Sequence, residues 1–251
     1  MRPRRDRVEP RRFRQARFAL GEVWAYARSG LYTTLGPRFL DRAEGEHTGV
    51  GVLFVHGVGA NATQFRALGS AIAGIAAQLD AFEYRSRHRL EDLTLRLEEK
   101  LGQVARESEQ ILVIGHSLGG LLARTVLQRG SVPSNVTGFV SICAPLSGTT
   151  RARFALSPSL RALAPGSAMF RELEASAGRL HRLERVLAIG AERDLFLDPI
   201  EGAFLPAHPA LRLTDAGHVG SLFDPRVHEA VREVLYDLAR AHQRRKLSSL
   251  A

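Results

Sequence analysis

Short, uninterrupted runs of apolar residues constrain the fold of this chain more than any other feature. Each run is about as long as one strand, and a segment with helical periodicity separates it from the next. Strands that are apolar on both faces are typical of parallel sheets covered by helices on both sides. We therefore predict an α/β fold with a mostly parallel central sheet, whose strands lie within residues 50–57, 80–86, 110–117, 136–145, 185–194 and 210–218.

The segments between these runs have the spacing of amphipathic helices. We predict helices over residues 63–79, 90–108, 118–130 and 224–242. Thr63 is a candidate N-cap of the first helix, and Gly130 is expected to close the third. Parallel sheets bind ligands beyond the carboxyl ends of their strands, so residues that carry chemistry are expected at those ends.

The composition divides the chain into four parts. Residues 1–11 are basic and are expected to be disordered, whereas residues 12–47 have apolar positions at helical spacing and predict an amphipathic helical segment. This segment could pack on the core or lie on a membrane, and we favour packing because isolated helices are marginal in water. Residues 48–243 are expected to form the α/β domain, and residues 244–251 a second basic tail.

The net charge of +9 is concentrated at the two ends of the sequence. Residues 1–17 hold eight arginines against Asp6 and Glu9, which gives +6, and residues 240–251 carry +4. Basic ends favour anionic surfaces such as phospholipid headgroups or nucleic acids. Because no nucleic-acid-binding motif accompanies them, we expect no nucleic-acid partner. Peripheral contact with an anionic membrane stays open as an alternative to solvated tails.

The sequence also bears on the compartment of the protein. No stretch approaches the roughly 20 apolar residues of a transmembrane helix, and no secretory signal is apparent, so we expect a cytoplasmic protein. Cys143 is the one cysteine, which excludes an internal disulfide. It lies in the apolar run "FVSICAP", where we expect a buried thiol.

Residues 115–119 read Gly-His-Ser-Leu-Gly, a G-x-S-x-G motif between a predicted strand and a predicted helix. In that context the serine is typical of a nucleophile on a sharp, strained turn, with glycines where side chains would clash. The helix that follows favours developing negative charge at its N-terminus. Ser117 is therefore our candidate nucleophile.

A serine hydroxyl needs a base, and the base needs a carboxylate that fixes its tautomer. We predict that His218, between the last strand and the last helix, is the base. His56 and His116 are weaker candidates, because we expect the turns to hold them. Asp194 comes directly off a predicted strand and is the favoured acid. The alternative acids are Asp198 and Asp215.

The oxyanion hole needs two backbone N–H groups aimed at one point. We expect one from Leu118, the residue after the candidate nucleophile. The other is expected from Val58, in the glycine-containing loop "HGVGAN" after the first strand.

Five blocks, "VLFVHGVGANATQF", "VIGHSLGGLLAR", "SICAPLSGT", "IGAERDLFLDP" and "GHVGSLFDPRV", resemble bacterial esterases and lipases of the α/β-hydrolase superfamily. The nearest group is the small class 2 lipases related to lipase A of Bacillus, and the resemblance covers about residues 48–240. It implies the α/β-hydrolase fold, with Ser117, Asp194 and His218 as a catalytic triad and Val58 and Leu118 as oxyanion donors. In that fold we expect a small cap between the strand-6 and strand-7 regions, from residues 151–175. The run after Pro145 lacks the polar residue usual in that group, which affects the pocket wall.

Together these features predict a serine hydrolase of carboxylic esters, an esterase or lipase that works through an acyl-enzyme without metal or organic cofactor. We expect a small ester or lipid substrate with an apolar acyl or alcohol part. Thioester, amide and acyl-transfer chemistry use the same machinery and stay open. The alternative function is not enzymatic: the chain would be a non-catalytic, membrane-associated binding module on the same fold.

Overall fold

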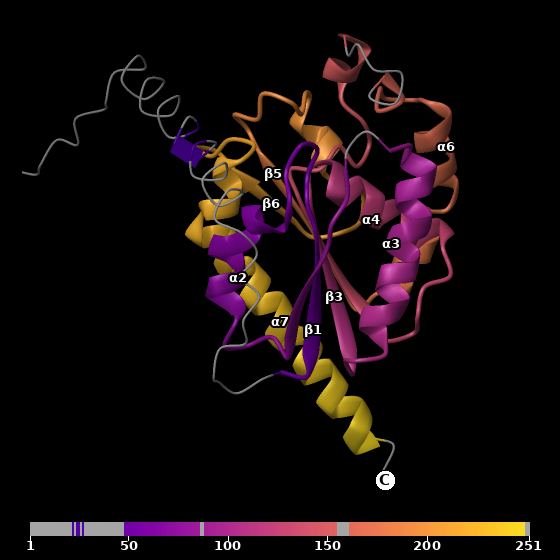
Figure 1. Cartoon of the computed structure of the whole chain (residues 1–251), viewed down its shortest axis with the longest axis vertical. Coiled ribbons are helices and arrows are strands. Elements are labelled where there is room, and N and C mark those ends of the chain that lie inside the picture. The colour runs from indigo at the N-terminus through magenta and orange to yellow at the C-terminus, as the bar shows by residue number, and fades with distance from the viewer. Residues whose placement is uncertain are drawn as a thin grey trace, which may run out of the picture.

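The structure is a computed structural model that describes residues 22, 24, 25, 27, 48–85, 88–154 and 161–248. Within this part of the chain, six strands form one sheet in the order β2-β1-β3-β4-β5-β6, and every neighbouring pair is parallel (Figure 1). This confirms the predicted α/β class and central parallel sheet. The strands are β1 (Val50–Val55), β2 (Gln78–Phe82), β3 (Gln110–His116), β4 (Val136–Ile142), β5 (Arg185–Ala191) and β6 (Ala210–Leu213).

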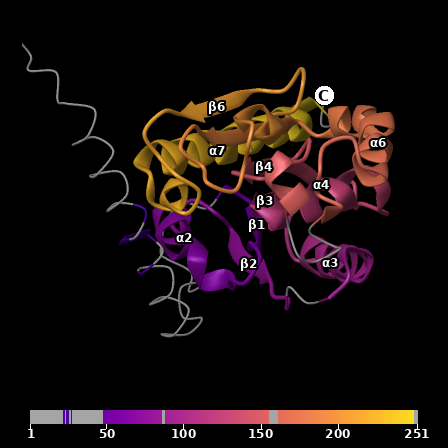
Figure 2. The same cartoon turned by 90° about the horizontal axis from the view of Figure 1, so that it is seen from above.

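Helices cover both faces of the sheet. In Figure 1, α2 (Arg66–Ile72) and α7 (Pro225–Ser248) lie on one side, and α3 (Leu90–Ala105) and α4 (Leu118–Arg129) lie on the other. Seen from above, α6 (Ala168–Ala175) lies outside α4 (Figure 2). The result is a three-layer arrangement in which β1, β3 and β4 are buried along their whole length.

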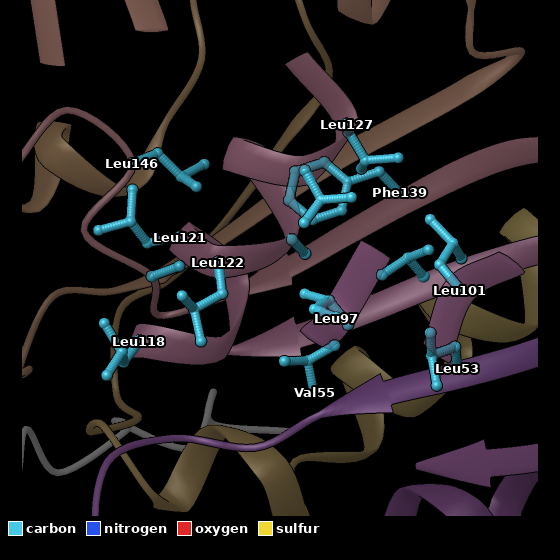
Figure 3. Packing of buried hydrophobic residues seen from close by; sticks show 14 of the residues in the cluster. Leu53, Val55, Leu97, Leu101, Leu118, Leu121, Leu122, Leu127, Phe139 and Leu146 are labelled. Carbon is cyan, nitrogen blue, oxygen red and sulfur yellow. The ribbon is translucent and has the colours of Figure 1, made fainter. Parts of the chain in front are cut away.

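The alternation of side chains along β1 shows why these sequences form a doubly covered sheet. Leu53 and Val55 point into the cluster with α3 and α4, whereas Val52 and Phe54 point into the cluster with α2 and α7. In the first cluster they meet leucines of α3 and α4 and Phe139 of β4 (Figure 3). Each fully buried side chain of this size contributes about 1.5–3 kcal/mol, so both layers stabilise the sheet.

The strand order reverses direction at β1. Its chain neighbour β2 pairs on one side, and the next strand, β3, pairs on the other. In open α/β sheets the crevice at such a switch point is where ligands bind. His56 directly follows β1, and Ser117 directly follows β3. The fold thus brings two of the sequence-predicted loops to the same place.

Three local predictions were wrong in detail. Asn61, not Thr63, caps the first helical segment, since its Oδ1 accepts from the Thr63 N–H at 3.0 Å. This segment is a short 3-10 turn, η2 (Ala62–Phe65), followed by α2, and the strand expected from residue 80 already begins at Gln78. Residues 78 and 79 lie in β2 because they pair with Gly51 and Val52 of β1.

The C-terminal boundary also differs from the prediction. Residues 244–248, which we expected in a basic tail, continue helix α7. Arg245 pairs with Glu184, and Lys246 Nζ lies 2.7 Å from Glu109. These partners hold the last turns of the helix against the amino-terminal edge of the sheet, where β3 and β5 begin.

The segment expected to form a cap is only partly described. Its described residues form η3 (Thr150–Phe154) and α6, and η4 (Ala177–Arg182) follows. Phe170, Leu173 and Leu180 are buried in the same cluster as α4, so α6 and η4 extend that helical layer. A cap over the strand ends stays a prediction.

Most of the predicted N-terminal elements, residues 1–47, lie outside the described residues. The four that are described, Glu22, Trp24, Ala25 and Ala27, are helical, as the apolar spacing predicts. Among the described helices, all are too short or too polar to cross a bilayer.

Candidate active site

Ser117 lies on a strained turn between β3 and α4. Its backbone has φ 52° and ψ −126°, a region that costs free energy for any residue with a side chain. The positions on either side of Ser117 require glycines, because there is no room for a side chain. A Cβ at Gly115 would lie 2.4 Å from the Gly120 Cα, and one at Gly119 would lie 2.1 Å from the Val55 carbonyl oxygen. The motif therefore presses the start of α4 against the end of β1, as a nucleophile turn requires.

The loop after β1 approaches this turn equally closely. A Cβ at Gly57 would lie 3.1 Å from both the Ser117 Cβ and the His116 Nδ1. His56 is occupied by the loop itself: Nδ1 bonds the Gly57 carbonyl at 2.8 Å, and Nε2 accepts from the Tyr84 N–H at 3.2 Å. Because both ring nitrogens are used, His56 holds the loop and is not a candidate base.

His218 and Asp194 form the central pair of the site. His218 Nδ1 lies 2.6 Å from Asp194 Oδ2, and both residues are buried, at 7% and 8% exposure. The other carboxylate oxygen accepts from the N–H groups of Phe196 at 2.8 Å and Leu197 at 3.0 Å. A carboxylate fixed in this way orients the imidazole, leaves Nε2 as its open nitrogen and stabilises a positive charge on the ring.

The two alternative acids lie elsewhere. Asp198 Oδ2 is 3.6 Å from Arg151 Nε, and Asp215 pairs with Arg226 at 2.5 Å. The side chains of both aspartates are largely exposed, so they serve surface ion pairs. Of the three candidate carboxylates, the structure brings Asp194 to His218.

The backbone carbonyl of His218 is held by two donors. His116 Nε2 lies 3.0 Å from this oxygen, and the Ser221 hydroxyl donates to it at 2.8 Å. Burial lowers the pKa of His116 to about 3, so its imidazole is neutral and the proton that it donates is on Nε2. His116 therefore joins the Ser117 turn to the loop that carries His218. Ser221 was missed by the sequence analysis, because nothing local marks a hydroxyl that caps a neighbouring carbonyl.

The Cys143 thiol lies behind this pair. It contacts the Ser221 hydroxyl at 3.4 Å, and burial raises its pKa well above the ordinary value of a thiol. Ligand atoms of Cys143, Asp194 and His218 lie within 4.8 Å of one another, which is close enough for a metal site. We interpret Asp194 and His218 as a hydrogen-bonded pair and not as metal ligands, because both Asp194 oxygens are engaged and the Cys143 thiol stays protonated. The expectation of a buried thiol is confirmed.

The two expected oxyanion donors flank the turn. Leu118 is the first residue of α4, so its N–H has no acceptor within the helix. Val58 follows Gly57, which approaches Ser117, and its side chain is 50% exposed. Two N–H groups at these positions could stabilise a negative charge that develops beside Ser117.

Glu22 is the residue of the site region that the sequence analysis missed most clearly. It is 7% exposed, and its Oε1 accepts from the Gly220 N–H at 2.9 Å, two residues after His218. The available signal was weak: Glu22 is the one acidic residue between positions 10 and 40, and glycines stand at 217 and 220.

A parallel sheet in this order, with a strained serine turn at its switch point and an Asp–His pair at its carboxyl edge, is the α/β-hydrolase fold, which solved structures of lipases share with this chain. Within it, residues 51–175 match the family model of palmitoyl protein thioesterases. No curated protein sequence matches the chain. The narrower resemblance to class 2 lipases stays a prediction.

Solved structures share the fold at low sequence identity. A lipase of Bacillus licheniformis in its mature form is 12% identical, with a TM-score of 0.63 over 80% of this chain and 95% of that one. A monoacylglycerol lipase of Paleococcus ferrophilus is 18% identical, with a TM-score of 0.52 over 80% and 98%. A bacterial membrane phospholipase A is 16% identical, with a TM-score of 0.53 over 88% and 93%.

Proposed function

We propose that the protein is a serine hydrolase of carboxylic esters, with Ser117 as nucleophile, His218 as base and Asp194 as the orienting acid. The observation that carries the proposal is the buried 2.6 Å contact between Asp194 and His218 beside the strained Ser117 turn. An Asp–His pair of this kind is the base that a serine hydroxyl needs at neutral pH.

In this reaction the Ser117 Oγ attacks the carbonyl carbon of the ester while its proton passes to His218 Nε2. The N–H groups of Leu118 and Val58 stabilise the negative charge on the carbonyl oxygen. The imidazolium then gives its proton to the leaving alcohol, and an acyl-enzyme forms on Ser117. Water, which gives a proton to His218 as it attacks, releases the acid and restores the hydroxyl.

Apolar side chains beside the site support a substrate with an apolar part. Phe196, which is 55% exposed, lies with its ring centroid 5.0 Å from that of His218. Leu195, 63% exposed, precedes it, and Val58 lies in the loop that approaches Ser117. Burial of such exposed side chains against an acyl chain gains about 25 cal/mol for each Å² removed from water.

Thioester hydrolysis is the second candidate, and the palmitoyl protein thioesterase match over residues 51–175 favours it. The same three side chains would act, with a thiolate as leaving group. An oxygen ester and a thioester with the same octanoyl chain separate the two candidates. Whichever of these two substrates has the higher kcat/KM identifies the leaving group that the site prefers.

A fluorophosphonate probe and the Ser117→Ala variant test the proposal. We expect the probe to label the native protein and not the variant, and kcat for ester hydrolysis to fall by about 10⁴-fold or more. Ser70→Ala, at an exposed position of α2, is the matched control and should keep both properties. If a folded Ser117→Ala variant keeps most of its activity, the serine mechanism is wrong. An unlabelled native protein would favour the non-catalytic binding module.

A further inference from the structure

Glu22 contacts the loop that carries His218 although it lies 198 residues before Gly220 in the sequence. Glu22 and Ala25 are buried at 7% and 6%, whereas Trp24 is 69% exposed. Since residues three apart share one face of a helix, Glu22 and Ala25 form the face that packs on the protein. In Figure 1 the indigo pieces of this segment lie beside the gold ribbon that precedes α7.

Two glycines on either side of His218 make room for the Glu22 carboxylate. A Cβ at Gly217 would lie 2.2 Å from Glu22 Cδ, and its three nearest atoms all belong to the Glu22 side chain. A Cβ at Gly220 would lie 2.4 Å from Glu22 Oε1. Neither glycine has a left-handed backbone, so space alone explains the missing side chains. The loop is therefore shaped to receive this carboxylate.

The Glu22 carboxylate interacts electrostatically with the two charged groups of the proposed site. Burial raises the pKa of Glu22, while hydrogen bonds from the N–H groups of Gly220 and Val219 and the charge of His218 act in the opposite direction. Asp194 is the other charged group that acts on it. A buried carboxylate that accepts backbone N–H groups holds those groups firmly, because leaving the donors unpaired costs about 1–3 kcal/mol each.

We infer that Glu22 is a positioning residue for His218: its carboxylate anchors the backbone of residues 217–220 and thereby keeps the imidazole aligned with Asp194 and Ser117. The helical turn that carries Glu22 and Ala25 is then a part of the active site. This inference rests on the proposed serine mechanism. Without the anchor, His116 and Ser221 still hold the His218 carbonyl, so the alignment is loosened rather than lost.

The first test compares Glu22→Ala with Glu22→Gln. The alanine variant should lose on the order of 10-fold to 100-fold in kcat, because small misplacements of a catalytic group have effects of that size. KM should change little, since Val58 and Phe196 are untouched. The glutamine variant keeps an acceptor oxygen and should stay within a few-fold of the native kcat. Trp24→Ala, on the exposed face of the same helix, is the matched control and should leave kcat unchanged.

A double-mutant cycle with Gly217→Ala isolates the contact even if one variant folds poorly. Alone, the new Cβ must displace the Glu22 carboxylate, so kcat should fall. In the Glu22→Ala background those three nearest atoms are removed, so the same change should cost much less. Because both single changes disturb one contact, their effects on kcat and on the rate of fluorophosphonate labelling should be strongly non-additive.

The outcomes separate this inference from the proposed function. Additive effects, a native kcat in Glu22→Ala, or a folded Glu22→Gln variant as slow as Glu22→Ala would overturn the positioning role. If Ser117→Ala is inactive while any of these holds, only the role of Glu22 fails. If Ser117→Ala stays active, the serine mechanism itself is wrong, whatever the Glu22 variants do.

Discussion

Asp194 and Asp198 show how neighbours assign different tasks to two identical side chains four residues apart. Asp194 is buried, bonds two backbone N–H groups and faces His218, whereas Asp198 is exposed and faces Arg151. The sequence favours Asp194 because it follows a strand, but spacing alone does not exclude Asp198. The difference becomes visible only when β5 and the loop that carries His218 are placed side by side.

Asp194→Asn should lower kcat by roughly 10⁴-fold, because an amide favours the wrong tautomer of His218 and cannot stabilise the imidazolium. The matched control is Asp198→Asn, which removes an exposed ion pair and should leave kcat within about two-fold, since such pairs contribute about 0–1 kcal/mol. Steady-state kinetics on one ester measure both. If Asp198→Asn proves to be the inactive variant, the assignment of the acid is wrong.

His116 predicts how the stability of the protein depends on pH. Burial holds its folded pKa near 3, whereas an unfolded histidine titrates near 6.5. Below about pH 6.5 the unfolded chain therefore binds a proton that the folded protein does not, and stability falls as the pH falls towards 3. From pH 7 to pH 5 this one group should lower the free energy of unfolding by about 2 kcal/mol.

Urea unfolding of the native protein and of His116→Gln at pH 7 and pH 5 measures this effect. Glutamine keeps an N–H donor for the His218 carbonyl but does not titrate, so the variant should lose less stability on acidification. An equal loss in both proteins would show that His116 is not the neutral group that we assign. His56, whose pKa burial also lowers, should keep part of the acid sensitivity in both proteins.

At the scale of elements, the continuous apolar runs were sufficient to locate the central strands β1, β3 and β4, because these are buried on both faces by side chains of alternating direction. The prediction was wrong where a helix and the following strand share one apolar segment, although Gly74 marks the point at which the helix ends. Residues 63–79 read as one helix, but α2 ends at Ile72, and pairing with β1 places Gln78 and Leu79 in β2. Such a boundary depends on a tertiary contact that local spacing does not encode.

Two leucines of α3 test the assignment of its buried face. Leu97 is 1% exposed and packs in the cluster with β1 and α4, whereas Leu95 is 62% exposed. Leu97→Ala should lower the free energy of unfolding by about 2–5 kcal/mol, because it removes buried methyl groups and leaves a cavity. Leu95→Ala should change it by no more than about 0.5 kcal/mol. Similar losses for the two variants in denaturant unfolding would contradict this packing.

At the scale of the whole molecule, the class of fold was predictable, and the contacts between the ends of the chain were not. Ser117, Asp194 and His218 could be proposed because each follows a strand, and all strands end at one edge of the sheet. Glu22 could not, since no periodicity links it to glycines almost 200 residues later. The pairing of Arg245 with Glu184 was missed for the same reason.

The position of His218, 101 residues after Ser117 in the sequence, has a consequence for biosynthesis. A ribosome that has exposed only residues 1–190 has already released the Ser117 turn, the three strands before it and strand β4 after it, but neither Asp194 nor His218. The growing chain then presents a serine on a bent turn with no base to ionise it. Under the mechanism proposed above, hydrolytic activity can arise only after His218 has emerged and its loop meets Glu22. The order of synthesis thus separates the appearance of the serine from the appearance of the histidine and aspartate that would activate it.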